Sequence, residues 1–121
     1  MKLLLVEDDP EMGIVTRAAL KRAGFAVTLA SNGPDAIAAA QRDGPEVILL
    51  DWMMPDMDGP EVCRRLKADP ATSGIPVIFL TARSQQAELD LGLSLGAIGY
   101  ITKPYDAPTL GAQIKTLLQR P

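Results

Sequence analysis

Residues 46–59 read EVILLDWMMPDMDG and contain the clearest structural signal in the chain. Four consecutive aliphatic residues, Val47–Leu50, are typical of a parallel strand that helices cover on both faces. The run ends at Asp51, and Pro55 and Gly59 among the acidic residues that follow are typical of a loop. The stretch therefore predicts a buried strand with an aspartate and an acidic loop at its carboxyl end.

Similar short apolar runs lie on both sides of this stretch. Leu3–Val6 and Val77–Leu80 are also apolar at every position, so they too are expected to be covered on both faces. The predicted strands, in chain order, are Lys2–Val6, Ala26–Ala30, Glu46–Leu50, Pro76–Leu80 and Ile98–Ile101.

Longer segments with helical spacing separate these strands. The first begins at Asp9-Pro10, a cap residue followed by a proline at the first helical position, and stops at Gly24. Its apolar stripe is interpreted as Met12, Val15, Ala19 and Leu20. The other helices are predicted from Gly33-Pro34 to about Gly44-Pro45, from about Pro60 to Ala68, from about Gln85 to Leu95, and around Leu110, Ile114, Leu117 and Leu118.

Five alternating strand–helix units predict the α/β class, with a doubly wound, five-stranded parallel sheet, helices on both faces and right-handed crossovers. A flavodoxin-like strand order of 2-1-3-4-5 would place the first and third strands side by side at the switch point. The 121 residues contain no repeat or linker. Residues 1–121 are therefore expected to form a single domain, with no effector domain.

The composition is that of an ordinary globular protein, with 47% hydrophobic and 22% charged residues. No apolar run is long enough for a membrane span, and the first run is too short for a signal peptide. A single cysteine, Cys63, excludes an internal disulfide and fits a reducing compartment. We therefore expect a cytoplasmic protein without a membrane partner, in which Cys63 is a small core residue.

The net charge and the absence of histidine exclude several classes of function. The net charge is −3, so no basic surface indicates direct nucleic-acid binding. The sequence contains no histidine, which excludes a histidine phosphocarrier, a Ser-His-Asp hydrolase and any histidine-ligated metal site. If a phosphoryl group reaches this chain from a histidine, that histidine belongs to another protein.

Polar side chains follow four of the predicted strands. They are Glu7–Asp9, Asp51, Thr81 and Lys103. Because ligands of doubly wound sheets bind beyond the carboxyl ends of the strands, we expect these side chains to lie together, with Asp8 facing Asp51. Clustered carboxylates repel one another, and Mg²⁺, which prefers carboxylates, water and phosphate oxygens, relieves that repulsion.

The other side chains of this group suit a phosphoryl group. Lysine supplies a compact positive charge, and a threonine hydroxyl can donate to a phosphoryl oxygen. Aspartate is an established acceptor that forms an aspartyl phosphate. The pattern therefore indicates a site that binds Mg²⁺ and a phosphoryl group. Asp9 is interpreted as a helix cap rather than as a metal ligand.

The chain resembles a response-regulator receiver domain of bacterial two-component signalling along essentially its whole length. The segments that carry the resemblance, in the family's order and near its spacing, are LLLVEDD at 3–9, VILLDWMMPDMDG at 47–59, PVIFLTA at 76–82 and GAIGYITKPY at 96–105.

The resemblance implies a role for each matching residue. Asp51 would be the phosphoacceptor and would also bind Mg²⁺. Asp8 would bind the metal directly, Glu7 through water, and Met53 through its backbone carbonyl. The remaining implied roles are that Thr81 and Lys103 contact the phosphoryl group, that the Lys103-Pro104 bond is cis, and that Tyr100 is the switch aromatic.

The resemblance also implies partners. A sensor histidine kinase or a histidine phosphotransfer protein would supply the phosphoryl group. Thr81 would then move toward the phosphate and Tyr100 would rotate inward, so that a downstream output protein or domain, or a second copy in a phosphorylation-dependent homodimer, reads the face of helix 4, strand 5 and helix 5. Such a switch catalyses only its own phosphorylation and dephosphorylation, and is not an enzyme with a metabolite substrate.

The fourth helix departs from the family pattern. The range 84–102 contains no lysine or arginine, although receivers that dimerise usually carry basic residues on this helix, and Ile98-Gly99 stand where two acids are frequent. A salt-bridged dimer is therefore doubtful. The leucines of the fourth helix pair at helical spacing, Leu89 with Leu93 and Leu91 with Leu95. Either one pair forms an exposed apolar docking surface, or the helix is apolar but fully buried.

Two other classes of function stay open at this point. A phosphorylation-independent pseudo-receiver scaffold usually lacks an acid, the threonine or the lysine, which are all present here. A phosphatase or phosphotransferase with an aspartate nucleophile usually carries a second acid two residues on, where Met53 stands. A separate question is the context of the domain, since the chain could equally be a stand-alone adaptor or part of a longer regulator. In the loop after Asp51, Gly59 is expected to supply a positive φ before the third helix, and Trp52 is expected to be partly exposed.

Overall fold

The computed structural model describes residues 1–82, 86–103 and 105–119. Strands and helices alternate through the chain, and the strands form one parallel sheet of order β2-β1-β3-β4-β5. The elements are β1 (Lys2–Val6), α1 (Pro10–Arg22), β2 (Ala26–Ala30), α2 (Gly33–Asp43), β3 (Val47–Asp51), α3 (Gly59–Ala68), β4 (Val77–Thr81), α4 (Gln86–Ser94), β5 (Gly99–Thr102) and α5 (Ala107–Leu118). The predicted fold class and strand order are confirmed.

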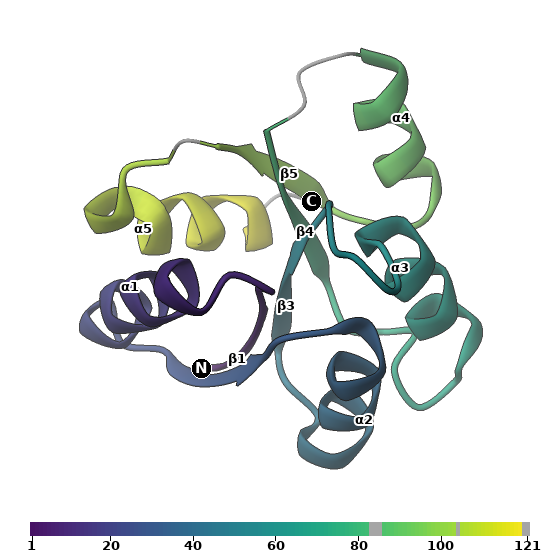
Figure 1. Cartoon of the computed structure of the whole chain (residues 1–121), viewed down its shortest axis with the longest axis horizontal. Coiled ribbons are helices and arrows are strands. Elements are labelled where there is room, and N and C mark those ends of the chain that lie inside the picture. Colours follow the sequence, from purple (N-terminus) through teal and green to yellow (C-terminus); the bar gives the residue numbers. More distant parts are fainter. Residues whose placement is uncertain (83–85, 104, 120–121) are drawn as a thin grey trace.

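The sheet lies between two layers of helices. Helices α1 and α5 cover one face, and α2, α3 and α4 cover the other (Figure 1). Because successive side chains of a strand point to opposite faces, β1 contributes to both cores. Leu3 and Leu5 pack in the core with Leu110 and Ile114 of α5, and Leu4 and Val6 pack in the core on the α2 and α3 side.

Strands β3 and β4 are buried at every position, as expected for central parallel strands. The edge strand β5 alternates instead between buried and exposed residues. In the part of the chain that the structure describes, no helix has the length and apolar character needed to cross a membrane.

Helix α1 begins as the sequence predicts but turns a different face to the sheet. Asp9 caps it by accepting hydrogen bonds from the backbone N–H groups of Glu11 and Met12, at 3.0 and 3.4 Å. The predicted apolar stripe is wrong at Met12 and Val15, which are exposed, and right at Leu20, which is fully buried. The buried face consists of Gly13, Thr16 and Leu20. Small residues on this face let α1 approach β2 closely: a Cβ at Gly13 would lie 3.2 Å from Leu29 Cδ2.

Helix α4 sits on the sheet through a glycine. A Cβ at Gly92 would lie 3.1 Å from the Phe79 ring and 3.2 Å from the Trp52 ring. Leu89 is buried beside it, whereas Leu91 and Leu93 are 46% and 44% exposed. The expected pairing of leucines is therefore wrong, as is the alternative of a fully buried helix. Leu95 lies beyond the end of α4 and packs against the core, so helical spacing does not place it.

Candidate functional site

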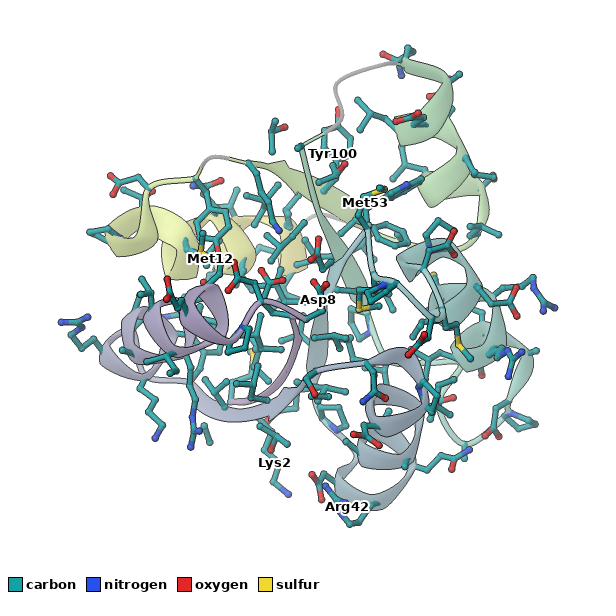
Figure 2. The ribbon with its side chains drawn as sticks, viewed as in Figure 1. Lys2, Asp8, Met12, Arg42, Met53 and Tyr100 are labelled. Carbon is teal, nitrogen blue, oxygen red and sulfur yellow. The ribbon has the colours of Figure 1, made fainter. Side chains whose placement is uncertain are left out.

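A pocket of about 220 Å³ opens at the carboxyl ends of β1 and β3. Asp8 and Met53 both line it (Figure 2). Larger hollows of about 450 and 410 Å³ lie beside β2 and between α1 and α5, but neither is lined by more than one carboxylate. The full lining of the smaller pocket is Glu7, Asp8, Asp9, Met12, Asp51, Trp52, Met53, Ala82 and Lys103.

Three carboxylates meet in this pocket. Glu7 and Asp8 follow β1, and Asp51 ends β3. Because Val6 pairs with Leu50 in the sheet, the residues that come next are neighbours. Each of the three side chains offers an oxygen within 4.8 Å of the oxygens of the other two. Glu7 is 3% exposed and Asp51 is 5% exposed, so the surrounding water screens their charges poorly. This is a donor set of hard oxygen ligands that fits Mg²⁺.

Lys103 reaches the carboxylates from the loop after β5. Its ammonium Nζ lies 3.1 Å from Asp51 Oδ1 and 3.3 Å from Glu7 Oε1. Its backbone N–H donates to the Thr81 carbonyl at 2.7 Å, which fixes the start of the loop to β4. One positive charge is thus placed between two nearly buried negative ones.

The ammonium of Lys103 does not offset the effects of burial and of Asp51 on the Glu7 carboxylate. Burial raises the pKa of Glu7 from 4.5 to about 7, and its hydrogen bond to Asp51 and repulsion from that carboxylate add to the rise, while Lys103 opposes it. Burial alone would lower the pKa of Lys103, but the negative charges of Asp51 and Glu7 raise it above its ordinary value. The ammonium is therefore held in its charged form, and a further cation would favour ionised Glu7.

The loop that follows Asp51 is held close to the strand by Gly59. The Gly59 N–H donates to the Trp52 carbonyl at 2.9 Å. A Cβ at Gly59 would collide with the Asp51 carbonyl oxygen and would lie 2.9 Å from Trp52 Cα. The predicted positive φ at Gly59 is wrong, since the positive-φ glycines of the described residues are Gly24, Gly44 and Gly96. Glycine is needed here for close approach and not for backbone conformation.

Trp52 lines the pocket but is buried in the core. Its ring meets Phe79 edge to face, with the centroids 4.8 Å apart, under α4. It is only 7% exposed, so the expectation of a partly exposed tryptophan is wrong. Packing against an aromatic ring of the next strand determines this orientation, and sequence spacing does not reveal it.

The other predicted site residues lie around the pocket in different ways. Thr81 is buried at the end of β4, and its neighbour Ala82 lines the pocket. Met53 is largely exposed on the loop. Tyr100 lies on the edge strand β5 opposite Phe79 and is 38% exposed (Figure 2). The predicted cis bond involves Pro104, which lies outside the described residues.

Sequence analysis missed one contact beside the site. The Thr16 hydroxyl on α1 and the Tyr105 hydroxyl, which follows Lys103 in the β5–α5 loop, lie 2.5 Å apart. The available sequence signal is a threonine in the middle of α1, and the predicted stripe of Met12, Val15, Ala19 and Leu20 leaves Thr16 off the buried face.

A family model and the sequence relatives of this chain all point to the response regulators. The family model described as the response regulator receiver domain matches residues 3–115. The phosphate regulon transcriptional regulatory protein PhoB of Rhizobium meliloti is 39% identical over 119 residues, which cover 98% of this chain and 52% of that protein. The sensory transduction protein RegX3 of Mycolicibacterium smegmatis is 41% identical over 118 residues, with 98% and 50% covered. The chain thus spans about half the length of these curated relatives.

Solved structures agree with the sequence relatives. The chemotaxis protein CheY4 of Vibrio cholerae superposes with a TM-score of 0.90 at 28% identity, covering 96% of this chain and 97% of that one. A response regulator from Desulfuromonas acetoxidans superposes with a TM-score of 0.86 at 31% identity, covering 98% and 96%. The similarity therefore includes the whole sheet and both helical layers.

Proposed function

The chain belongs to the response regulator receiver domain family, and from this premise we propose that Asp51 accepts a phosphoryl group from a histidine of a partner protein. That partner would be a sensor histidine kinase or a histidine phosphotransfer protein, and the reaction would take place in the cytoplasm. As a receiver domain of two-component signalling, the chain is a signalling module and not a classical enzyme.

The observation that carries this proposal is the meeting of Asp51, Glu7, Asp8 and Lys103 in one pocket. Asp51 presents a nearly buried carboxylate at the end of β3. In the transfer, one of its oxygens bonds to phosphorus as the phosphorus–nitrogen bond of the phosphohistidine breaks, and the imidazole leaves with the bonding electrons. Lys103, already 3.1 Å from Asp51, would stabilise the negative charge of the transferring group.

The carboxylate cluster supports a metal requirement. Asp8, Asp51 and the Met53 carbonyl would hold Mg²⁺ directly, and Glu7 would hold it through water. When bound, Mg²⁺ would neutralise the carboxylates and the phosphoryl oxygens. The raised pKa of Glu7 supports this role, because burial and the neighbouring Asp51 carboxylate disfavour its charged form and a bound cation would offset both effects.

We further propose that phosphorylation is read through α4, β5 and α5. Thr81, buried at the end of β4, would donate its hydroxyl to the phosphoryl group, and Tyr100, exposed on β5, would rotate inward. Leu91 and Leu93 add exposed apolar area on α4. An output protein or domain would dock here, in keeping with relatives named as transcriptional regulatory proteins. A phosphorylation-dependent homodimer would use the same face.

The phosphorylation-independent scaffold is not favoured. Such a scaffold has no need of three carboxylates and a lysine in one pocket, and here all four are present and in contact range. The aspartate-dependent phosphatase is not favoured either, because Met53 stands two residues after Asp51, where such enzymes usually carry the second acid.

Trp52 provides the test, because its buried ring adjoins Asp51. The protein is titrated with Mg²⁺ and then with beryllium fluoride, which mimics a phosphoryl group, while tryptophan emission is recorded. A saturable change that needs Mg²⁺, vanishes in Asp51→Ala and persists in Asp43→Asn supports the proposal, since Asp43 is a partly exposed aspartate at the end of α2, outside the pocket. A folded wild-type protein whose emission does not respond, and whose mass is unchanged after incubation with acetyl phosphate, would refute it.

A further inference from the structure

The hydroxyl groups of Thr16 and Tyr105 connect two parts of the chain that are 89 residues apart. Thr16 lies in the middle of α1 and is fully buried, and Tyr105 is half-buried against the core beneath α1 and α5. The two oxygens lie 2.5 Å apart. A buried hydroxyl is costly unless it is hydrogen-bonded, so this contact favours one arrangement of the two segments.

The loop that carries Tyr105 also carries Lys103. The Lys103 N–H donates to the Thr81 carbonyl, which attaches the start of the loop to β4. Tyr105, two residues later, attaches the loop to α1. The Lys103 side chain therefore leaves a short segment held on both sides, and its ammonium ends between Glu7 and Asp51.

The same face of α1 approaches the pocket one turn earlier. A Cβ at Gly13 would lie 3.9 Å from Glu7 Cγ. Residues three apart on a helix lie on the same face, so Gly13 and Thr16 face the sheet together. One face of α1 thus contacts both Glu7 and the loop that presents the lysine opposite it.

We propose that Tyr105 is a positioning residue, whose hydrogen bond to Thr16 holds the β5–α5 loop against α1 so that the Lys103 ammonium stays aligned on Asp51. The inference rests on the proposed phosphorylation of Asp51, and it adds to that reaction a residue that does not line the pocket. Tyr105 itself touches none of the reacting atoms and acts through Lys103.

A double-mutant cycle tests the contact. Thr16→Val, Tyr105→Phe and the double variant keep the shapes of the side chains and remove the hydroxyl groups. The rate of Asp51 phosphorylation by acetyl phosphate is measured at saturating Mg²⁺. Each single change is expected to slow the reaction by about threefold to tenfold, and the double change no more than either. Thr72→Val is the matched control, because its buried hydroxyl donates to the Leu66 carbonyl at 2.7 Å, away from the pocket; it should leave the rate unchanged.

A second comparison separates positioning from a general loss of stability. In a Lys103→Ala background, Tyr105→Phe is expected to cause no further slowing. Equal slowing with and without Lys103, or a Tyr105→Phe variant with the wild-type rate, would overturn the inference.

The NMR signals of the Lys103 ε-methylene group give a readout that needs no phosphorylation. They should shift in Thr16→Val and Tyr105→Phe and stay in place in Thr72→Val; unmoved signals in all three variants would also overturn the inference. If the wild-type chain accepts no phosphoryl group, the proposed function fails, and these signals still decide whether Tyr105 positions Lys103.

Discussion

The Lys103 ammonium lies 3.1 Å from Asp51 Oδ1, although 52 positions separate the two residues in the chain. They meet because β3 and β5 end at the same edge of one parallel sheet, with β4 between them. Glu7 completes the contact from β1, 3.3 Å from the same nitrogen. A single cation therefore serves two carboxylates, and the behaviour of the pocket should depend strongly on it.

Replacing Lys103 by glutamine should slow phosphorylation of Asp51 by about a hundredfold, since one preorganised charge that faces the transferring group is lost. The rate with acetyl phosphate at saturating Mg²⁺ measures the effect. Lys115→Gln, a change on α5 away from the pocket, is the control. A Lys103→Gln variant with the wild-type rate would show that the ammonium has no part in the transfer.

The metal-free protein should lose stability as the pH rises. The folded-state pKa of Glu7 is about 7, above its ordinary 4.5, so between these values the folded state holds a proton that the unfolded state releases. The free energy of unfolding should therefore fall across this window, by up to about 3 kcal/mol, and level off above it. Urea denaturation at several pH values in the presence of a chelator measures it.

Two controls identify Glu7 as the source of that slope. Glu7→Gln should flatten the dependence, because the amide cannot ionise. Added Mg²⁺ should restore stability at the alkaline end by binding the ionised carboxylates. A slope that is the same in Glu7→Gln and in wild type would assign the titration to another group.

Gly59→Ala should destabilise the fold by about 3 kcal/mol or more, because the added methyl group would meet the backbone of Asp51 and Trp52, which cannot move aside easily. Gly74→Ala is the matched control, since a Cβ there meets no atom within 4 Å. Thermal denaturation compares the two. Equal melting temperatures would mean that the loop after Asp51 can shift to accept a side chain.

The leucines of α4 should behave in opposite ways. Leu89→Ala, in the buried position, should cost about 2 to 3 kcal/mol of unfolding free energy. Leu91→Ala, in an exposed position, should change it by less than about 0.5 kcal/mol. Chemical denaturation distinguishes them, and a large loss in Leu91→Ala would show that its side chain is covered.

The fold could be predicted from the sequence because its main signal is local. Val47–Leu50 and Val77–Leu80 are short, continuous apolar runs bounded by loop signals, and such runs are typical of central parallel strands. The residues of the pocket are predictable for the same reason: Asp51 ends β3, Lys103 directly follows β5, and parallel strands end at one edge of the sheet.

The features that the sequence did not reveal depend on packing between elements. The buried face of α1 is set by the space that Gly13 leaves for Leu29, and not by which side chains are most apolar. Leu95 follows the end of its helix, and Trp52 rotates under Gly92 to meet Phe79. None of these follows from a periodic pattern, because each is decided by a partner distant in the sequence.

The place of Lys103 after the last strand has a consequence for the newly made protein. During synthesis, Glu7, Asp8 and Asp51 leave the ribosome long before the lysine that pairs with two of them. The carboxylates therefore repel one another without that counter-charge until β5 joins the sheet. A partial sheet of β1, β3 and β4 would therefore hold its carboxylates together less stably than the complete sheet does.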